Sequence, residues 1–168
     1  MINIIKMQRD DCRQIAAWNL NKGQDFLYQW AGRKIYSHPL DADQLTARLE
    51  DPSIIIFKIT NEEKMIGTVE LNMDDCPDGT AKVCRFLIPE PYSGKGIGQE
   101  VLQRAARFAS DELDLSRLEL GVYTFNVRAI RCYEKSGFIV KAFHKDPRDQ
   151  KWNSYTMEKF LRENRHGI

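Results

Sequence analysis

The residues with the clearest chemical potential are three glycines between a strand-like run and a helix. Gly94, Gly96 and Gly98 follow the apolar run 83–88 and a turn-rich connector, and they open a helical pattern of apolar residues. Glycines let the backbone turn tightly and bring bare N–H groups close to a ligand. The helix start adds unpaired N–H donors and the positive end of the helix dipole. The segment therefore predicts an anion site that prefers a phosphate or pyrophosphate.

Two common phosphate-binding motifs do not fit this loop. A P-loop needs G-x-x-x-x-G-K-[ST], but Lys95 lies between two glycines and no Ser or Thr follows it. A dinucleotide-binding fingerprint needs G-x-G-x-x-G, and Gln99 stands where its third glycine would be. The structural alternative is that the glycines only form a tight turn from a strand to a helix.

The elements around the loop predict a mixed α/β domain. Strands are expected at 2–6, 54–60, 65–73, 80–88, 117–124, 138–144 and 154–160, and short turns make the earlier neighbours antiparallel. Helices are expected after Asp10 and Asp11, from Asp41 to about Glu50 with Gln44 in a capping box, after Gly96, and from Asn126 to Gly137. Residues 24–40 fit neither periodicity, so a long aromatic loop is expected there.

Composition limits the class of protein. The 168 residues are expected to form a single domain, 1–168, and a net charge of +1 argues against a dedicated nucleic-acid partner. The four cysteines are scattered, which predicts reduced thiols in a cytoplasmic protein, and the isolated histidines predict no metal site. No run approaches the roughly 20 apolar residues that a membrane span needs.

Two blocks of sequence resemble the GCN5-related N-acetyltransferase (GNAT) family. The first is Ser93-Gly94-Lys95-Gly96-Ile97-Gly98, similar to the family's pyrophosphate loop, although Ser93 replaces the usual Arg or Gln. The second has the form N-x-x-A-x-x-x-Y-x-K-x-G-F and contains Asn126, Ala129, Tyr133, Lys135, Gly137 and Phe138. The resemblance implies the GNAT fold, α/β (α+β), with a mixed, mostly antiparallel sheet of six to seven strands and about four helices.

The resemblance also implies transfer of an acetyl group from acetyl-coenzyme A (acetyl-CoA) to a primary amine. The cosubstrate would lie on residues 93–98, on Asn126 and Ala129, and along the end of the preceding strand at Phe86, Leu87 and Ile88. Asn126 and Tyr133 are almost two helical turns apart and share a face. Asn126 is expected to bond the pantetheine arm, or to act as a plain N-cap. Tyr133 is expected to contact the cosubstrate and to protonate the departing thiolate, with core packing as its alternative.

The sequence says less about which residue takes the proton from the amine and about which amine accepts the acetyl group. Glu70 is the first choice for the base, on the polar face of its strand, and Glu90 is the second. Five aromatic residues are expected near the acceptor, which suits a polyamine, an aminoglycoside-like amine or a peptide or protein amine: Trp18, Phe26, Tyr28, Trp30 and Tyr36. The alternative function is a non-catalytic acyl-CoA sensor. A homodimer is possible, and the run 158–168 forms either a dimer contact or a solvated end.

Overall fold

The structure is a computed structural model that describes residues 1–161. Its strands are β1 (Ile2–Lys6), β2 (Ile54–Asn61), β3 (Lys64–Asn72), β4 (Thr80–Leu87), β5 (Arg117–Tyr123), β6 (Ile139–His144) and β7 (Ser154–Phe160). Its α-helices are α1 (Cys12–Asn19), α2 (Gln24–Ala31), α3 (Ala42–Leu49), α4 (Ile97–Asp111) and α5 (Val127–Lys135). Short 3₁₀ helices, η1 (Arg9–Asp11) and η2 (Gln150–Trp152), complete the elements.

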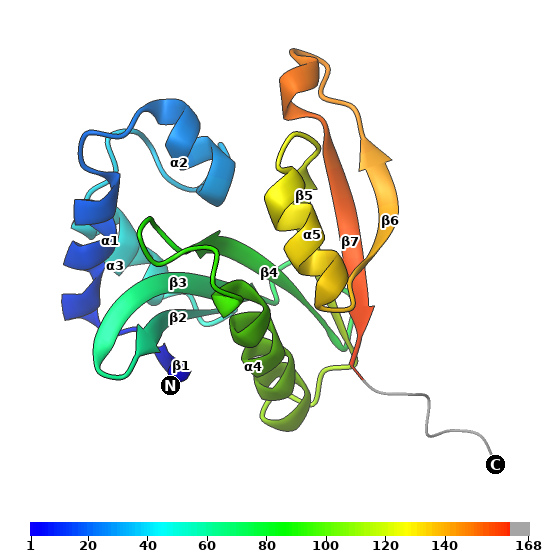
Figure 1. Cartoon of the computed structure of the whole chain (residues 1–168), viewed down its shortest axis with the longest axis horizontal. Coiled ribbons are helices and arrows are strands. Elements are labelled where there is room, and N and C mark those ends of the chain that lie inside the picture. Colours follow the sequence, from blue (N-terminus) through cyan, green and yellow to red (C-terminus); the bar gives the residue numbers. More distant parts are fainter. Residues whose placement is uncertain (162–168) are drawn as a thin grey trace.

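The seven strands form one sheet in the order β1-β2-β3-β4-β5-β7-β6. Only the central pair, β4 and β5, is parallel, and every other neighbouring pair is antiparallel. Figure 1 shows β5, β6, β7, α5 and η2 on one side of a central gap and the remaining helices and strands on the other. The predicted mixed, mostly antiparallel α/β sheet is confirmed.

Two hydrophobic cores form because side chains alternate along the strands. Ile54 and Ile56 of β2 pack with the first three helices, where Ile15, Leu27 and Leu45 are buried. Phe57 and Ile59 of the same strand lie in the larger core with α4 and the rest of the sheet. The sheet is therefore covered on both faces, which fixes the positions of the elements around the central gap.

Residues 24–40 differ from the sequence prediction. Instead of a continuous loop, Gln24–Ala31 form the helix α2, so there are five α-helices where about four were expected. Leu27 and Ala31, one turn apart, are the only buried residues of α2. This stripe is too narrow for a helical period to stand out from the surrounding aromatic residues.

The N-cap of α3 is confirmed, but the capping box is wrong. The Asp41 carboxylate accepts a hydrogen bond from the backbone N–H of Gln44 at 3.0 Å. The Gln44 side chain does not return to Asp41; it accepts from the backbone N–H of Ser37 at 2.8 Å and donates to the carbonyl of Pro39. Gln44 therefore ties the α2–α3 connection to α3.

Two further sequence predictions concern the last strand and the absence of a membrane span. Ser154–Phe160 forms β7 as predicted, whereas residues 162–168 of the expected tail lie outside the described residues. Within residues 1–161, no helix has both the length and the apolar character that crossing a membrane requires.

Replacing the α3 cap tests the role of Asp41. Asp41→Ala is expected to lower the free energy of unfolding by about 1 kcal/mol, because the N–H of Gln44 loses its acceptor. Urea denaturation measures this loss. The matched control is Asp43→Ala in the first turn of the same helix, where only the charge–dipole contribution of roughly 0.3–1 kcal/mol is removed. Equal stability of wild type and Asp41→Ala would contradict the assignment.

Candidate active site

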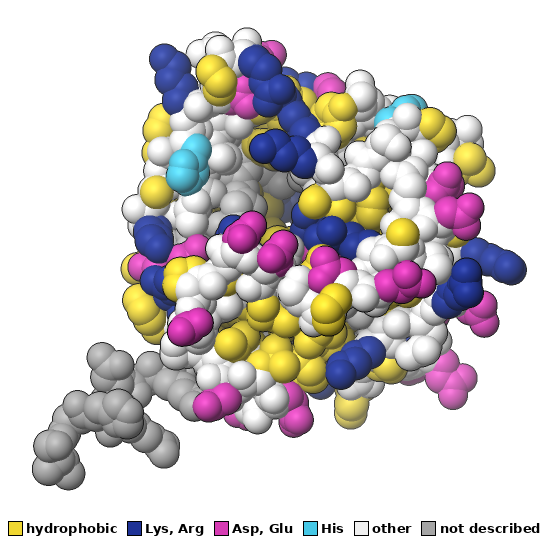
Figure 2. Space-filling model, turned by 180° about the vertical axis from the view of Figure 1, so that it is seen from behind, with side chains coloured by type: hydrophobic (Ala, Val, Ile, Leu, Met, Phe, Trp, Pro, Cys, Tyr) yellow, Lys and Arg dark blue, Asp and Glu magenta, His cyan; other side chains and the backbone are white. Residues whose placement is uncertain are grey.

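A cleft opens where β4 and β5 separate. Only Thr80–Lys82 of β4 pair with Arg117–Glu119 of β5, so the rest of β4 has no partner on that side among the described strands. A cavity of about 1100 Å³ lies between the two strands and the elements that follow them. Seen from behind, the molecule is hollowed between its two halves, with Lys and Arg side chains beside the hollow (Figure 2). A free strand edge of this kind can bind an extended, amide-containing chain.

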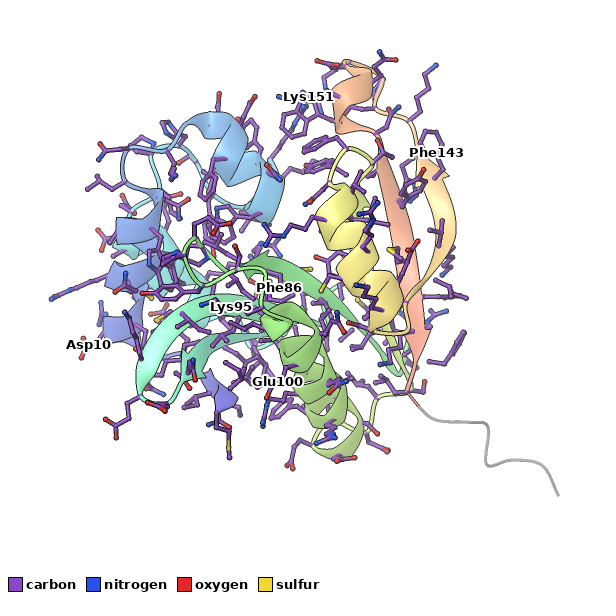
Figure 3. All side chains as sticks on the ribbon, in the orientation of Figure 1. Asp10, Phe86, Lys95, Glu100, Phe143 and Lys151 are labelled. Carbon is purple, nitrogen blue, oxygen red and sulfur yellow. The ribbon has the colours of Figure 1, made fainter. Side chains whose placement is uncertain are left out.

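Most of the predicted cosubstrate-binding residues line this cavity. They are Phe86, Leu87, Ile88, Ser93, Gly94, Gly96, Gly98, Asn126, Ala129 and Tyr133. Two do not: Lys95 is exposed in the loop, and Ile97 packs against the larger core. Figure 3 shows Phe86 and Lys95 near the start of α4. The fold therefore brings β4, the glycine loop and α5 to one surface.

The glycine loop brings the backbone of Gly94, Gly96 and Gly98 to the cavity wall. Gly94 and Gly96 have φ of +87° and +73°, in the left-handed region that favours glycine. Gly96 precedes α4, and no side chain caps that helix start. A Cβ on Gly98 would lie 2.9 Å from Sγ of Cys132, so this position also needs glycine for close packing. Uncapped N–H groups at the start of a 15-residue helix fit a pyrophosphate.

Arg128 lies over the loop and was not singled out from the sequence. A Cβ on Gly94 would be 2.3 Å from Nη2 of Arg128, so the guanidinium touches the backbone there. Arg128 also pairs with Glu90 at 3.5 Å, and Glu90 accepts a hydrogen bond from Ser93. This arginine comes from α5 and supplies a cation where Ser93 replaces the basic or amide side chain of the family pattern.

A β-bulge bends β4 at the cavity. Thr68 pairs with Leu87 and Glu70 with Cys84, so Arg85 and Phe86 together face the single residue between them on β3. Arg85 has φ of +48°, a conformation that few non-glycine residues adopt. Bulges re-aim side chains and end regular pairing beside active sites. Here the bulge lies where β4 leaves β5.

Asn126 is the N-cap of α5, which was one of the two roles predicted for it. Its side-chain oxygen accepts from the backbone N–H of Ala129 at 3.3 Å. The oxygen accepts in the cap, and the amide nitrogen, which is the donor of this side chain, is left to donate to a ligand in the cavity. Asn126 can therefore hold a carbonyl of a bound chain while it fixes the start of α5.

Tyr133 lies seven residues further along α5, on the cavity wall. Its ring packs edge-on against Phe138 at 6.1 Å between ring centres, so it is also part of the packing under α5. Burial raises the pKa of the Tyr133 hydroxyl above its usual value near 10. The phenol is therefore protonated at neutral pH and can donate a proton.

Glu70 is buried, so its expected place on a polar face of the strand is wrong, and so is the alternative of a solvated strand face. The side chain is 1% exposed and does not line the cavity. Its Oε2 accepts from Nε of Arg48 at 3.0 Å, and its Oε1 accepts from Arg48 at 2.7 Å and from Arg85 at 2.9 Å. A carboxylate held by two guanidinium groups is badly placed to take a proton from an amine. This geometry favours a positioning role for Glu70.

Of the five aromatic residues expected near the acceptor, some line the cavity and the others pack inside the protein. Phe26 and Trp30 of α2 line the cavity. Tyr36 is buried against Trp30, and Trp18 packs on the smaller core. Tyr28 lies edge-on to Trp152 at 6.4 Å between ring centres, so it joins α2 to the other half of the molecule. Lys151 adds an ion pair with Asp25 across the same junction, at 2.7 Å.

The fold and this cleft agree with a known family of enzymes. The model of the acetyltransferase (GNAT) family matches residues 17–138. This chain therefore belongs to the GNAT family. The glycine loop, the end of β4 and the whole of α5 lie within the matched segment.

Several relatives are N-acetyltransferases. Spermidine N(1)-acetyltransferase of Vibrio cholerae is 26% identical over 134 residues, which cover 79% of this chain and 76% of that protein. The prophage-derived N-acetyltransferase YokL of Bacillus subtilis is 30% identical over 92 residues (55% and 51%), and spermine/spermidine N(1)-acetyltransferase of the same species is 32% identical over 65 residues (39% and 43%). The matched segments thus span about half the length of these two Bacillus relatives.

A solved structure shares the fold over nearly the whole chain. Spermidine N-acetyltransferase from Vibrio cholerae, solved in complex with CoA and spermine, superposes with a TM-score of 0.78 at 19% identity. The superposition covers 95% of each chain. At this identity the likeness shows the fold alone.

A charge in the glycine loop tests the anion site. Gly96→Glu is expected to weaken acetyl-CoA binding by about tenfold or more, since like charges near 4 Å repel by roughly 4 kcal/mol at intermediate dielectric. Calorimetric titration measures the dissociation constant. The matched control is Gly137→Glu, which places the same side chain at a left-handed position (φ +92°) outside the cavity. Equal weakening in both variants would show that backbone strain, and not charge at the loop, causes the effect.

Proposed function

We propose that this protein is an acetyl-CoA-dependent N-acetyltransferase that transfers the acetyl group directly to a primary amine. The observation that carries the proposal is a single cavity that joins the uncapped glycine loop, the free edge of β4 and the Tyr133 hydroxyl. These are an anion site, a site for an extended arm and a proton donor. Membership of the GNAT family and the activities named for its relatives support the same reaction.

The chain offers a place for each part of acetyl-CoA, which would supply the acetyl group as a thioester. Backbone N–H groups of residues 94–98 would hold the pyrophosphate, with the Arg128 guanidinium beside them. The end of β4, at residues 86–88, would pair with the pantetheine arm. The Asn126 amide nitrogen would donate to a carbonyl of that arm.

A backbone N–H and one side-chain hydroxyl would stabilise the thioester and the leaving sulfur during the reaction. A backbone N–H at the bulged end of β4 can bind the thioester oxygen as it gains negative charge. The amine nitrogen forms the new bond to the acetyl carbon as the carbon–sulfur bond breaks. Tyr133 gives its proton to the sulfur that leaves, whose thiol has a pKa of about 8.5, and the proton that the nitrogen of the new amide releases restores the phenol through water.

The attacking amine must first lose a proton. Among the described residues that line the cavity, Glu90 is the one carboxylate, and it is already engaged by Ser93 and Arg128. We therefore propose that the proton leaves through water or that the amine binds in its neutral form. Glu70, first chosen for this role from the sequence, would act through Arg85 and Arg48 as a positioning residue.

A cytoplasmic monomer or homodimer is the proposed working form. The edge strand β6 carries exposed apolar side chains, with Ile139 at 59% and Phe143 at 56% exposure, and Phe160 of β7 is 62% exposed. Apolar side chains gathered at a sheet edge favour self-association. The acceptor remains a primary amine of the polyamine, aminoglycoside-like or peptide class, and polyamines are the substrates named for several relatives.

Removing the Tyr133 hydroxyl tests the acid. Tyr133→Phe is expected to lower kcat by about 10²-fold with little change in acetyl-CoA affinity, because only proton donation is lost. Release of free thiol measures the rate. Tyr155→Phe is the matched control, since that ring packs on Phe143 and does not line the cavity. Unchanged kcat in Tyr133→Phe would reject the acid role. Acetyl-CoA binding without turnover of any amine would instead favour the sensor.

The pH dependence of the rate provides a second test. The folded-state pKa of Tyr133 is raised, so the acid stays protonated to higher pH than a free tyrosine. We expect kcat to rise with pH as the amine loses its proton and to show no decline below a pH of about 10. The contradicting result would be a fall in kcat between about pH 8 and about pH 9 while the protein stays folded. If Tyr133→Phe did not show that fall, a raised pKa of the Tyr133 hydroxyl would be ruled out.

A further inference from the structure

A buried cluster of two arginines and one glutamate borders the acceptor side of the cleft. Arg48 comes from α3, Glu70 from β3 and Arg85 from the β4 bulge, and the Glu70 carboxylate binds both guanidinium groups at 2.7–3.0 Å. The side chains of Arg48 and Arg85 are 13% and 12% exposed, and that of Glu70 is 1% exposed. Of the three, only Arg85 lines the cavity.

The three side chains of the cluster together carry one net positive charge, and Asp51, whose pKa is lowered by hydrogen bonds from Ser53 and then by Arg48, lies on the Arg48 side of it. Two guanidinium cations share one carboxylate, so one net positive charge remains in a largely water-excluded place. The neighbouring Tyr36 hydroxyl and Cys84 thiol do not offset it, because burial raises the pKa of both groups and keeps them neutral. An unpaired buried charge is costly, and an anion at the exposed end of the cluster would lower that cost.

Arg85 itself is incompletely bonded and is held in an unusual backbone conformation. Its Nη1 donates to Glu70, whereas its buried Nε has no hydrogen-bond partner among the described residues. A left-handed φ of +48° is a strained conformation for a residue with a side chain. Such strain gathers at functional sites. The bulge that imposes this strain brings the guanidinium to the cavity wall.

The position of Arg85 separates it from the basic residues that face the cosubstrate. Arg128, Arg131 and Lys135 lie on α5, beside the glycine loop and the arm site. Arg85 instead lies on β4, against which α2 packs with Phe26 and Trp30 on the cavity wall. Among the described lining residues of α2, β4 and β5, Arg85 is the one charged side chain.

We propose that the acceptor carries a carboxylate close to the amine that is acetylated, and that Arg85 binds this carboxylate. The inference rests on the proposed acetyl transfer and narrows its substrate class. A planar guanidinium suits a carboxylate, and Glu70 fixes its orientation from behind. A polyamine would bring further positive charges against Arg85 without a free carboxylate to receive them. The acceptor class is thus an amino acid, or a peptide whose acetylated amine lies on its C-terminal residue, and not a polyamine.

A matched pair of amines tests the proposal by binding, independently of turnover. L-lysine and cadaverine differ only in the carboxylate, and each is titrated calorimetrically into the protein saturated with CoA. Lysine is expected to bind at least about tenfold more tightly, the gain typical of a charge-assisted hydrogen bond. Equal binding, tighter binding of cadaverine or spermidine, or no binding of any of them would overturn the proposal.

Two arginine variants locate the effect. Arg85→Gln is expected to abolish the preference for lysine, and Arg85→Lys, which keeps the charge but loses the planar fork, to retain part of it. Arg48→Gln is the matched control: it removes the other guanidinium bound to Glu70 and one charge of the cluster but leaves Arg85 on the cavity wall, so it should lower the preference only in part. Circular dichroism confirms folding. Loss of the preference in both Arg85→Gln and Arg48→Gln would overturn a direct role for Arg85.

Thiol release from acetyl-CoA then separates this inference from the proposed function. Faster release with lysine than with cadaverine supports both. Preferential binding of lysine without any thiol release would contradict the transferase and leave the carboxylate site standing. Thiol release with cadaverine and spermidine, but not with lysine, would support the transferase and overturn the carboxylate site.

Discussion

The separation of β4 from β5 is the constraint on which the rest of the structure depends. Two parallel strands pair over only three residues each and then diverge inside one continuous sheet. Backbone donors and acceptors on a free strand edge need partners, because burying them unpaired is costly. The cavity, the glycine loop after β4 and the helix after β5 all follow from this divergence. The site is thus built mainly from backbone, which explains how relatives at low identity keep the same architecture.

The two ends of the cleft are stabilised by different interactions. At the glycine-loop end, uncapped N–H groups and Arg128 provide positive potential without a buried ion pair. At the end beside α2, the Glu70 carboxylate links α3 to the β4 bulge through two arginines. Removing that carboxylate would leave two buried cations facing each other, so the carboxylate stabilises an arginine in the cavity wall. The α2 helix closes this end through Tyr28 and Trp152.

The sequence predicted the sheet and the loop well, because local rules fix them. Alternating apolar residues defined β3, and Asn126 and Gly137 marked the ends of α5. The sequence-based predictions were wrong where tertiary contacts determine the local structure or the burial of a side chain. The helical state of α2 depends on packing by Leu27 and Ala31, and the burial of Glu70 depends on arginines 22 and 15 residues away in the chain. A charged residue in an alternating strand gives no sign of such partners.

Hydrogen exchange with and without acetyl-CoA tests the central claim most directly. The claim is that the cosubstrate binds the free edge of β4 and the N–H groups at the start of α4. We predict slower exchange of backbone amides in residues 86–99 when acetyl-CoA is bound, and unchanged exchange in Ile139–His144 of the distant β6. Unchanged exchange in residues 86–99 at saturating acetyl-CoA, or protection confined to other segments, would contradict the account.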